Sequence, residues 1–76
     1  MNQYGNIIRS SGVESYKIEN DLIAIKFVNI STVYIYSYIK PGQIKVEKMK
    51  SLARQGRGLT TYISKNVKKN YERKID

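Results

Sequence analysis

Residues 34–38 read Tyr-Ile-Tyr-Ser-Tyr, which places three of the seven tyrosines of the chain at every second position. Successive side chains of a β-strand point to opposite faces of its sheet, so Tyr34, Tyr36 and Tyr38 are predicted to share one face. The residues between and beside them are mostly apolar as well. Apolar residues on both faces indicate a central strand, which is expected to span residues 32–39.

Two more strands are expected before this one, at residues 13–19 and 22–28, with Asn20-Asp21 as the turn signal between them. The short connection predicts an antiparallel hairpin that pairs with residues 32–39. Pro41-Gly42 is expected to end the third strand, because proline has no N–H to donate to the ladder.

The chain after residue 42 has helical spacing. A first helix is predicted from an apolar face of about three turns, with Gly56 as the C-terminal cap. The apolar residues of this face are Val46, Met49, Leu52 and Ala53. A second helix is expected to begin with Thr60 or Thr61 as the N-cap. Its apolar stripe steps by three or four residues through Leu59, Tyr62, Ile63, Val67, Tyr71 and Ile75.

These elements predict an α+β fold in the order β-β-β-α-α, a three-stranded antiparallel sheet with two helices on one face. A chain of 76 residues has room for one domain, which is assigned to residues 12–76. Residues 1–11 are polar and have no clear period, so a flexible N-terminal arm is expected there. Ile7 and Ile8 are expected to dock this arm on the domain.

The composition argues against catalysis. Without cysteine or histidine, a disulfide, a thiolate metal site and the commonest general base are all excluded. The six carboxylates are scattered, and no base other than lysine is evident for any serine. We therefore expect no enzyme activity, no metal and no cofactor. No secretory signal or membrane-spanning stretch is recognised, so a soluble, cytoplasmic protein is expected.

The net charge of +8 is unevenly distributed along the chain. Residues 1–39 are balanced, whereas residues 40–76 contain eleven Lys or Arg against three acidic residues. An excess of positive charge in one half of a domain is typical of proteins that bind nucleic acid or another polyanion. A bias toward A/T-rich codons is the alternative, because it raises lysine and tyrosine together, but it does not explain the scarcity of acidic residues after residue 40.

The basic half supplies the candidate contacts. In the second helix, three lysines fall opposite the apolar stripe and are predicted to follow a phosphate backbone, although a merely solvated face is an equal alternative. The segment Arg54 to Gly58 leads into the same helix, whose N–H groups attract anions. A glycine-capped turn without a ligand is the favoured interpretation of that segment. The candidate nucleic-acid-binding residues are Lys50, Arg54, Arg57, Lys65, Lys68 and Lys69.

The three tyrosines of residues 34–38 allow two interpretations. In RNA-binding sheets, aromatic residues that stack on bases alternate with basic residues on the same face. Positions 32, 34, 36 and 38 contain no charged residue. A structural role is therefore favoured over base stacking, with Tyr62 and Tyr71 packing back on the tyrosines of the strand.

The order and spacing of these features resemble the KTSC domain, a family named for a segment at the C-terminus of some lysyl-tRNA synthetases. The resemblance runs from Ser10 to Ile75 and includes Tyr34-Ile35-Tyr36, the central motif, but the turn after Phe27 is longer and lacks the usual glycine. It implies the fold given above and a small bacterial or phage-encoded protein; RNA binding is a suggestion for the family, which has no established activity. The other residues that carry the resemblance are Ile23, Ile25, Phe27, Gly56, Arg57, Gly58, Ile63 and Tyr71.

Together these observations predict a non-catalytic module that binds nucleic acid, RNA before DNA, through a basic helical face. The alternative is a protein-interaction or regulatory module, encoded by a phage or mobile element, that docks an acidic protein or forms a dimer through a sheet edge.

Overall fold

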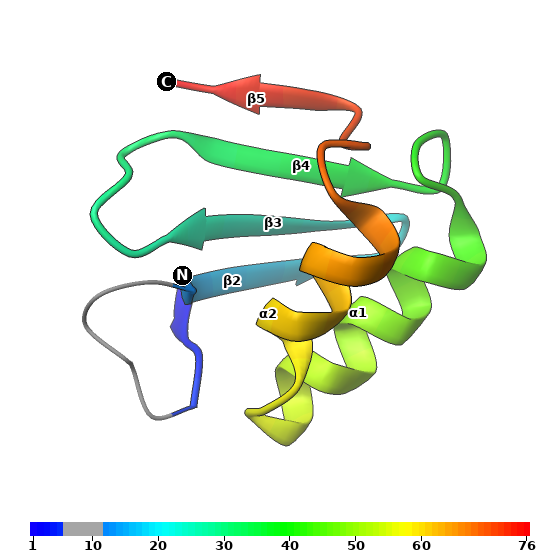
Figure 1. Ribbon diagram of the computed structural model, residues 1–76. Helices are drawn as coiled ribbons and strands as arrows, with labels where there is room; N and C mark the ends of the chain where they lie inside the picture. The colour runs from blue at the N-terminus through cyan, green and yellow to red at the C-terminus, as the bar shows by residue number, and fades with distance from the viewer. Residues whose placement is uncertain (6–11) are drawn as a thin grey trace.

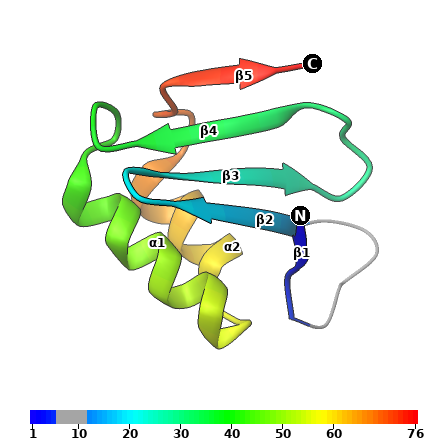
Figure 2. The ribbon, with the colours of Figure 1, turned by 180° about the vertical axis from the view of Figure 1, so that it is seen from behind.

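The structure, a computed structural model, describes residues 1–5 and 12–76 and shows an α+β fold with two layers. One layer is a five-stranded sheet in the order β1-β2-β3-β4-β5, in which every pair of neighbours is antiparallel. The helices pack on one face of this sheet, and no helix of the described chain covers the other face (Figures 1 and 2).

The centre of the sheet is the meander that the sequence predicts. It consists of β2 (Val13–Glu19), β3 (Leu22–Phe27) and β4 (Val33–Ser37). The register places Ile25 opposite Tyr34 and Ile23 opposite Tyr36, so these four side chains share the helix-bearing face. β4 is shorter than expected, because the chain turns after Ser37.

The prediction of three strands is wrong, since a short strand is added at each edge. β1 (Asn2–Gln3) pairs with β2, and β5 (Arg73–Ile75) pairs with β4. Both are too short to show a period in the sequence. β1 lies in the segment that the sequence predicts to be a flexible arm, and β5 lies in the segment that it predicts to be the second helix.

The first helix, α1 (Gln43–Gln55), confirms the apolar spacing of that segment. Val46, Met49 and Ala53 are buried against the sheet. Gly56 ends the helix in the left-handed conformation, with φ of 79°, and its N–H donates to the carbonyl of Leu52 at 3.0 Å. This glycine cap is the one that the sequence predicts.

The second helix is much shorter than predicted. It consists of α2 (Leu59–Tyr62) and a wider turn of π-helix, η1 (Ile63–Val67). Lys68 then takes positive φ, 55°, and directs the chain back along β4. The apolar stripe is helical up to Val67, but Tyr71 precedes β5 and Ile75 belongs to it, where Ile75 pairs with Val33.

The N-terminal segment packs on the start of α2. Tyr4 is buried, and its hydroxyl accepts a hydrogen bond from the N–H of Leu59 at 2.9 Å. Gly5 lies against Gly56 so closely that a Cβ on Gly5 would overlap the carbonyl oxygen of Gly56. Residues 1–5 of the expected arm are thus part of the fold, whereas Ile7 and Ile8 lie outside the described residues.

The expected N-cap of the second helix is also corrected. The N-cap is Gly58 rather than Thr60 or Thr61. Thr60 has another partner, because its Oγ1 accepts a hydrogen bond from the N–H of Val13 at 3.1 Å. Among the described helices, none is long and apolar enough to cross a membrane.

Candidate nucleic-acid interface

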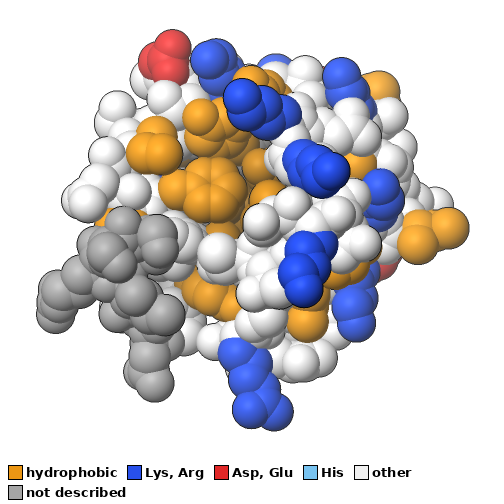
Figure 3. Space-filling model, in the orientation of Figure 1, with side chains coloured by type: hydrophobic (Ala, Val, Ile, Leu, Met, Phe, Trp, Pro, Cys, Tyr) orange, Lys and Arg blue, Asp and Glu red, His pale blue; other side chains and the backbone are white. Residues whose placement is uncertain are grey.

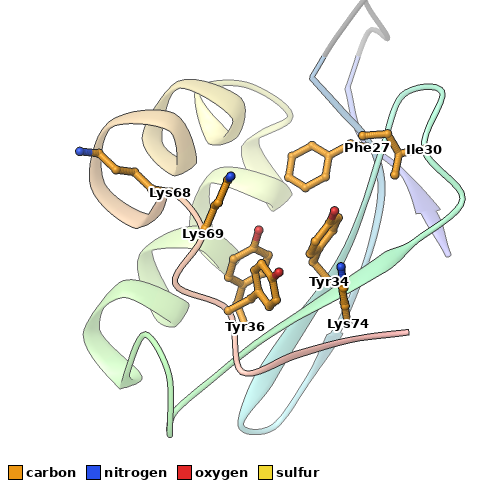
Figure 4. Close-up of a pocket in the computed structure, with 8 residues that line it drawn as sticks. Phe27, Ile30, Tyr34, Tyr36, Lys68, Lys69 and Lys74 are labelled. Atoms are coloured by element: carbon orange, nitrogen blue, oxygen red, sulfur yellow. The ribbon is translucent and has the colours of Figure 1, made fainter. Parts of the chain in front are cut away.

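A hollow opens on the helix-bearing face of the sheet, where the helices leave β4 and β5 uncovered (Figure 4). Its volume is about 380 Å³. The side chains around it come from the end of β3 and the loop that follows, from β4, and from the segment between η1 and the end of β5. We call this site the aromatic hollow; its lining residues are Phe27, Ile30, Tyr34, Tyr36, Lys68, Lys69, Tyr71 and Lys74.

Four aromatic rings form a continuous series in the hollow. The ring centroids of Phe27 and Tyr34 are 5.6 Å apart, those of Tyr34 and Tyr71 are 4.9 Å apart, and those of Tyr36 and Tyr71 are 6.2 Å apart. All three pairs meet edge to face, the arrangement that the ring quadrupoles favour. Tyr71 therefore packs back on the tyrosines of β4, as the sequence suggests, although it does so from an extended segment.

The rings differ in exposure. Tyr36 is 2% exposed and is the centre of the core at this end of the sheet. Burial, and then the neighbouring hydroxyls of Tyr34 and Tyr71, raise the pKa of Tyr36 well above its usual value, so its hydroxyl remains a neutral donor at physiological pH. Phe27, Tyr34 and Tyr71 are only partly buried, which leaves part of each ring open to a ligand.

Three lysines surround these rings. Lys68, Lys69 and Lys74 are exposed, and none of them makes an ion pair with any described residue. Lys74 stands directly opposite Tyr34 in the register of β4 and β5, which places both on one face. Figure 4 shows Lys69 and Lys74 beside the rings, whereas Lys68 extends away from them.

The acidic residues near the hollow already have partners. Glu72 binds Arg73 at 2.7 Å, and the Ser37 hydroxyl and then Arg73 hold the pKa of Glu72 below its usual value. Asp76 accepts a hydrogen bond from Thr32 at 2.6 Å. No acidic side chain lines the hollow, so the described part of the chain leaves its lysines uncompensated.

Five of the six predicted contacts are exposed, and two of them, Lys68 and Lys69, line the hollow. Figure 3 shows Lys and Arg side chains along one side of the apolar patch on the helix-bearing face. None of the five makes an ion pair within residues 1–5 and 12–76. We call these five exposed residues the basic rim: Arg54, Arg57, Lys65, Lys68 and Lys69.

Lys50, the sixth predicted contact, does not belong to this surface. Its side chain is 5% exposed, because it lies on the inner side of α1. The ammonium donates to the carbonyl of Asn20 at 2.8 Å and to the carboxylate of Glu47 at 2.9 Å. It also lies 5.4 Å from the centre of the Tyr38 ring. Lys50 therefore joins α1 to the β2–β3 turn and is not available to a phosphate.

Tyr38 is also separated from the aromatic hollow. Its hydroxyl donates a 2.6 Å hydrogen bond to Glu47, which raises the pKa of Tyr38. The same bond, followed by the bond from Lys50, lowers the pKa of Glu47. Of the three alternating tyrosines, Tyr38 thus ties β4 to α1, Tyr36 fills the core, and Tyr34 presents its ring to the hollow.

In the turn from Arg54 to Gly58, the first N–H group of α2 does not face an open surface. α2 has only four residues, and its first N–H is donated to the Tyr4 hydroxyl rather than to an open surface. The glycines at positions 56 and 58 both have positive φ, 79° and 87°, as a tight turn after a helix requires. This geometry confirms the glycine cap at Gly56.

Sequence reasoning missed Phe27, Tyr71 and Lys74 as members of a possible contact site. The strand of the three tyrosines has no basic residue on their face, which argues against a contact site. In the structure, Lys74 lies opposite Tyr34 because it belongs to the neighbouring strand. The only local signal is the alternation in Arg73-Lys74-Ile75, which is too short to predict a strand.

Comparisons of the chain with models of protein families, with curated proteins and with solved structures find no match. The resemblance to the KTSC domain therefore remains a hypothesis, and function is argued from the aromatic hollow and the basic rim.

Proposed function

We propose that this protein is a non-catalytic module that binds nucleic acid, RNA before DNA, through the basic rim. The observation that carries the proposal is that five Lys and Arg side chains of residues 54–69 are exposed and make no ion pair in the described chain. Surface charges that are not neutralised internally attract a polyanion over a distance and contact its phosphates.

Such contacts give affinity with little sequence preference, because every phosphate presents the same oxygens. The predicted KTSC resemblance is compatible with this role, since RNA binding is suggested for that family. An association with RNA rather than duplex DNA is further supported by the partly exposed aromatic rings beside the rim, which have no use on a duplex whose bases are stacked.

The alternative of a dimer formed through a sheet edge is less well supported. The edge strands of the described sheet are β1 and β5, with two and three residues. Short edges offer few unpaired N–H and C=O groups to another chain, and natural proteins use short edge strands to avoid pairing. Docking of an acidic protein on the basic rim remains the competing outcome of the tests below.

A salt series tests the proposal. Fluorescence anisotropy with short single-stranded RNA and DNA, and with a duplex, should show log K falling linearly with log salt, by about 0.7 for each neutralised phosphate of a single strand. Lys65→Glu should weaken binding to every sequence and make the slope less steep. Lys17→Glu is the matched control, because Lys17 is exposed on the sheet face that carries no helix.

Absence of binding at about 50 mM salt, or binding that ignores salt, would contradict the proposal. Equal effects of the Lys65 and Lys17 substitutions would show that net charge matters but the basic rim does not. Capture of a single acidic protein from a lysate after nuclease treatment, without any affinity for RNA or DNA, would establish the alternative.

A further inference from the structure

The aromatic hollow has a chemistry that the basic rim alone does not explain. Phosphate contacts need lysines on a convex surface, but they need no concavity and no aromatic rings. A partly exposed series of rings in a hollow is instead typical of a site for a flat or apolar ligand group. Phe27, Tyr34 and Tyr71 are all partly exposed there.

We propose that the hollow binds one unpaired base of a single-stranded nucleic acid, stacked on the ring of Tyr34 with Phe27 at its edge, and with Lys69 and Lys74 at the phosphates on either side. This inference rests on the proposed function and adds to it the strand state of the ligand and the place where a base is held.

The size of the hollow fits this ligand. Its volume, about 380 Å³, lies at the lower end of the roughly 300–1,000 Å³ of small-ligand pockets. It has room for one base with its sugar and not for a segment of duplex. A base that is paired and stacked within a duplex presents only its edge, so the ligand has to be unpaired at this position.

The charges around the hollow also fit. Lys69 and Lys74 stand beside the rings, one on the segment after η1 and the other on β5. A nucleotide has an apolar, flat base between anionic groups, and this arrangement has aromatic rings between cationic groups. An acidic peptide would satisfy the lysines, but its carboxylates would leave the ring faces without a flat partner.

The hydroxyls in the hollow can hold the edge of a base. Tyr34, Tyr36 and Tyr71 all line the hollow, so three phenol hydroxyls belong to its wall. A neutral phenol both donates and accepts, so it tolerates any base edge. Stacking with such permissive hydrogen bonding predicts weak sequence preference.

The single phenylalanine of the chain provides a specific probe, because Phe27 lies in the hollow. Incorporation of fluorophenylalanine gives one ¹⁹F signal that reports on this site in the full chain. We expect this signal to shift with a single-stranded RNA octamer and to stay in place with the same octamer carrying abasic sugars. A blunt duplex and a hexaglutamate peptide should not move it either.

Substitution then measures the stack. Tyr34→Leu should weaken single-strand binding by about 5- to 150-fold, the loss of one base–aromatic stack, while the salt slope stays the same. Tyr34→Phe should retain affinity. Tyr62→Leu is the matched control, since Tyr62 is a partly buried tyrosine that does not line the hollow.

The two proposals fail in different ways. If the rim substitution Lys65→Glu weakens binding but the abasic octamer binds as tightly as the normal one, with equal ¹⁹F shifts, the hollow takes no base and the proposed function survives. If the peptide shifts the ¹⁹F signal and the octamer does not, the hollow is a protein-docking site. If no nucleic acid binds at low salt, both proposals are overturned.

Discussion

Lys50 shows how a residue that looks like a surface cation in the sequence can be a structural one. It lies on α1 at a position next to the apolar face, and its long side chain reaches under Tyr38 to the carbonyl of Asn20. Lysine is rarely buried unless its ammonium finds partners, and here a carbonyl and a carboxylate supply them. The same residue therefore contributes to the fold and not to the contact surface.

Lys50→Ala is expected to lower the free energy of unfolding by about 1–3 kcal/mol, because it removes a buried charged hydrogen bond and leaves the Asn20 carbonyl without this donor. Urea denaturation measures this change. Lys48→Ala on the exposed side of α1 is the control and should stay within about 0.5 kcal/mol of the parent. Lys50→Ala should leave the affinity for RNA unchanged. If it lowers this affinity without lowering the free energy of unfolding, Lys50 contacts the RNA directly.

Glu47 connects the Tyr38 hydroxyl to the acid stability of the fold. The hydrogen bond from Tyr38, and then the bond from Lys50, lower the pKa of Glu47 from 4.5. A carboxyl group with a lower pKa in the folded state adds stability above its unfolded pKa, and this stability is lost as the pH falls through the folded pKa. Protonation of Glu47 should therefore loosen the contact between α1 and the end of β4.

Tyr38→Phe is expected to raise the pKa of Glu47 toward its usual value, because it removes the first cause of the shift. A ¹³C NMR titration of the Glu47 carboxyl measures it directly. Tyr62→Phe should leave the titration unchanged, and an unchanged titration in Tyr38→Phe would show that the bond is absent in solution.

The chain reversal at Lys68 decides the architecture of the C-terminal quarter. The apolar spacing of residues 59–75 fits one continuous helix, yet the helix ends at Val67 and the chain continues as β5. A lysine with φ of 55° is strained, whereas glycine adopts this conformation without a Cβ conflict.

Lys68→Gly therefore distinguishes the two architectures by the sign of its effect. With the reversal present, the substitution should raise the free energy of unfolding by up to about 1 kcal/mol. Within a continuous helix, the same substitution would lower it by about 1 kcal/mol. Lys65→Gly, inside η1, is the control and should be destabilising in either case. Thermal and urea unfolding with both variants give the answer.

The same segment shows what was predictable from the sequence. Local patterns predict β3, β4 and α1. The two strands follow from the alternation of apolar residues, and the helix follows from apolar residues spaced three or four apart. β5 depends on the pairing of Ile75 with Val33, more than forty residues away. No local pattern contains that information, and the hydrophobic residues of β5 fit a helix equally well.

The candidate site was missed for the same physical reason. Tyr34 and Tyr36 were correctly placed on one face, but the absence of basic residues on their own strand argued against a contact role. Lys74 reaches that face only because β5 lies beside β4. A site assembled from neighbouring strands becomes visible only when the pairing is known.

The molecule as a whole separates its charges by face. The helix-bearing face has the basic rim and the aromatic hollow, whereas two lysines of the opposite side, Lys17 and Lys26, are paired with Glu19 and Glu14. With a net charge of +8 that arises from residues 40–76, like charges repel one another in the free protein. A polyanion bound at the basic rim would relieve this repulsion.

Salt should therefore have opposite effects on the free protein and on its complex. Raising the salt concentration from about 10 to 150 mM screens the repulsion and should raise the Tm of the free protein. Saturation with single-stranded RNA at about 100 times its Kd should add about 2.7 kcal/mol to the free energy of unfolding, and the same salt should remove this gain. Circular dichroism melts with and without RNA measure both effects, and Lys65→Glu should reduce both. A Tm of the free protein that does not rise with salt would contradict the expected repulsion, and an RNA-dependent gain that persists at about 150 mM salt would contradict the phosphate contacts.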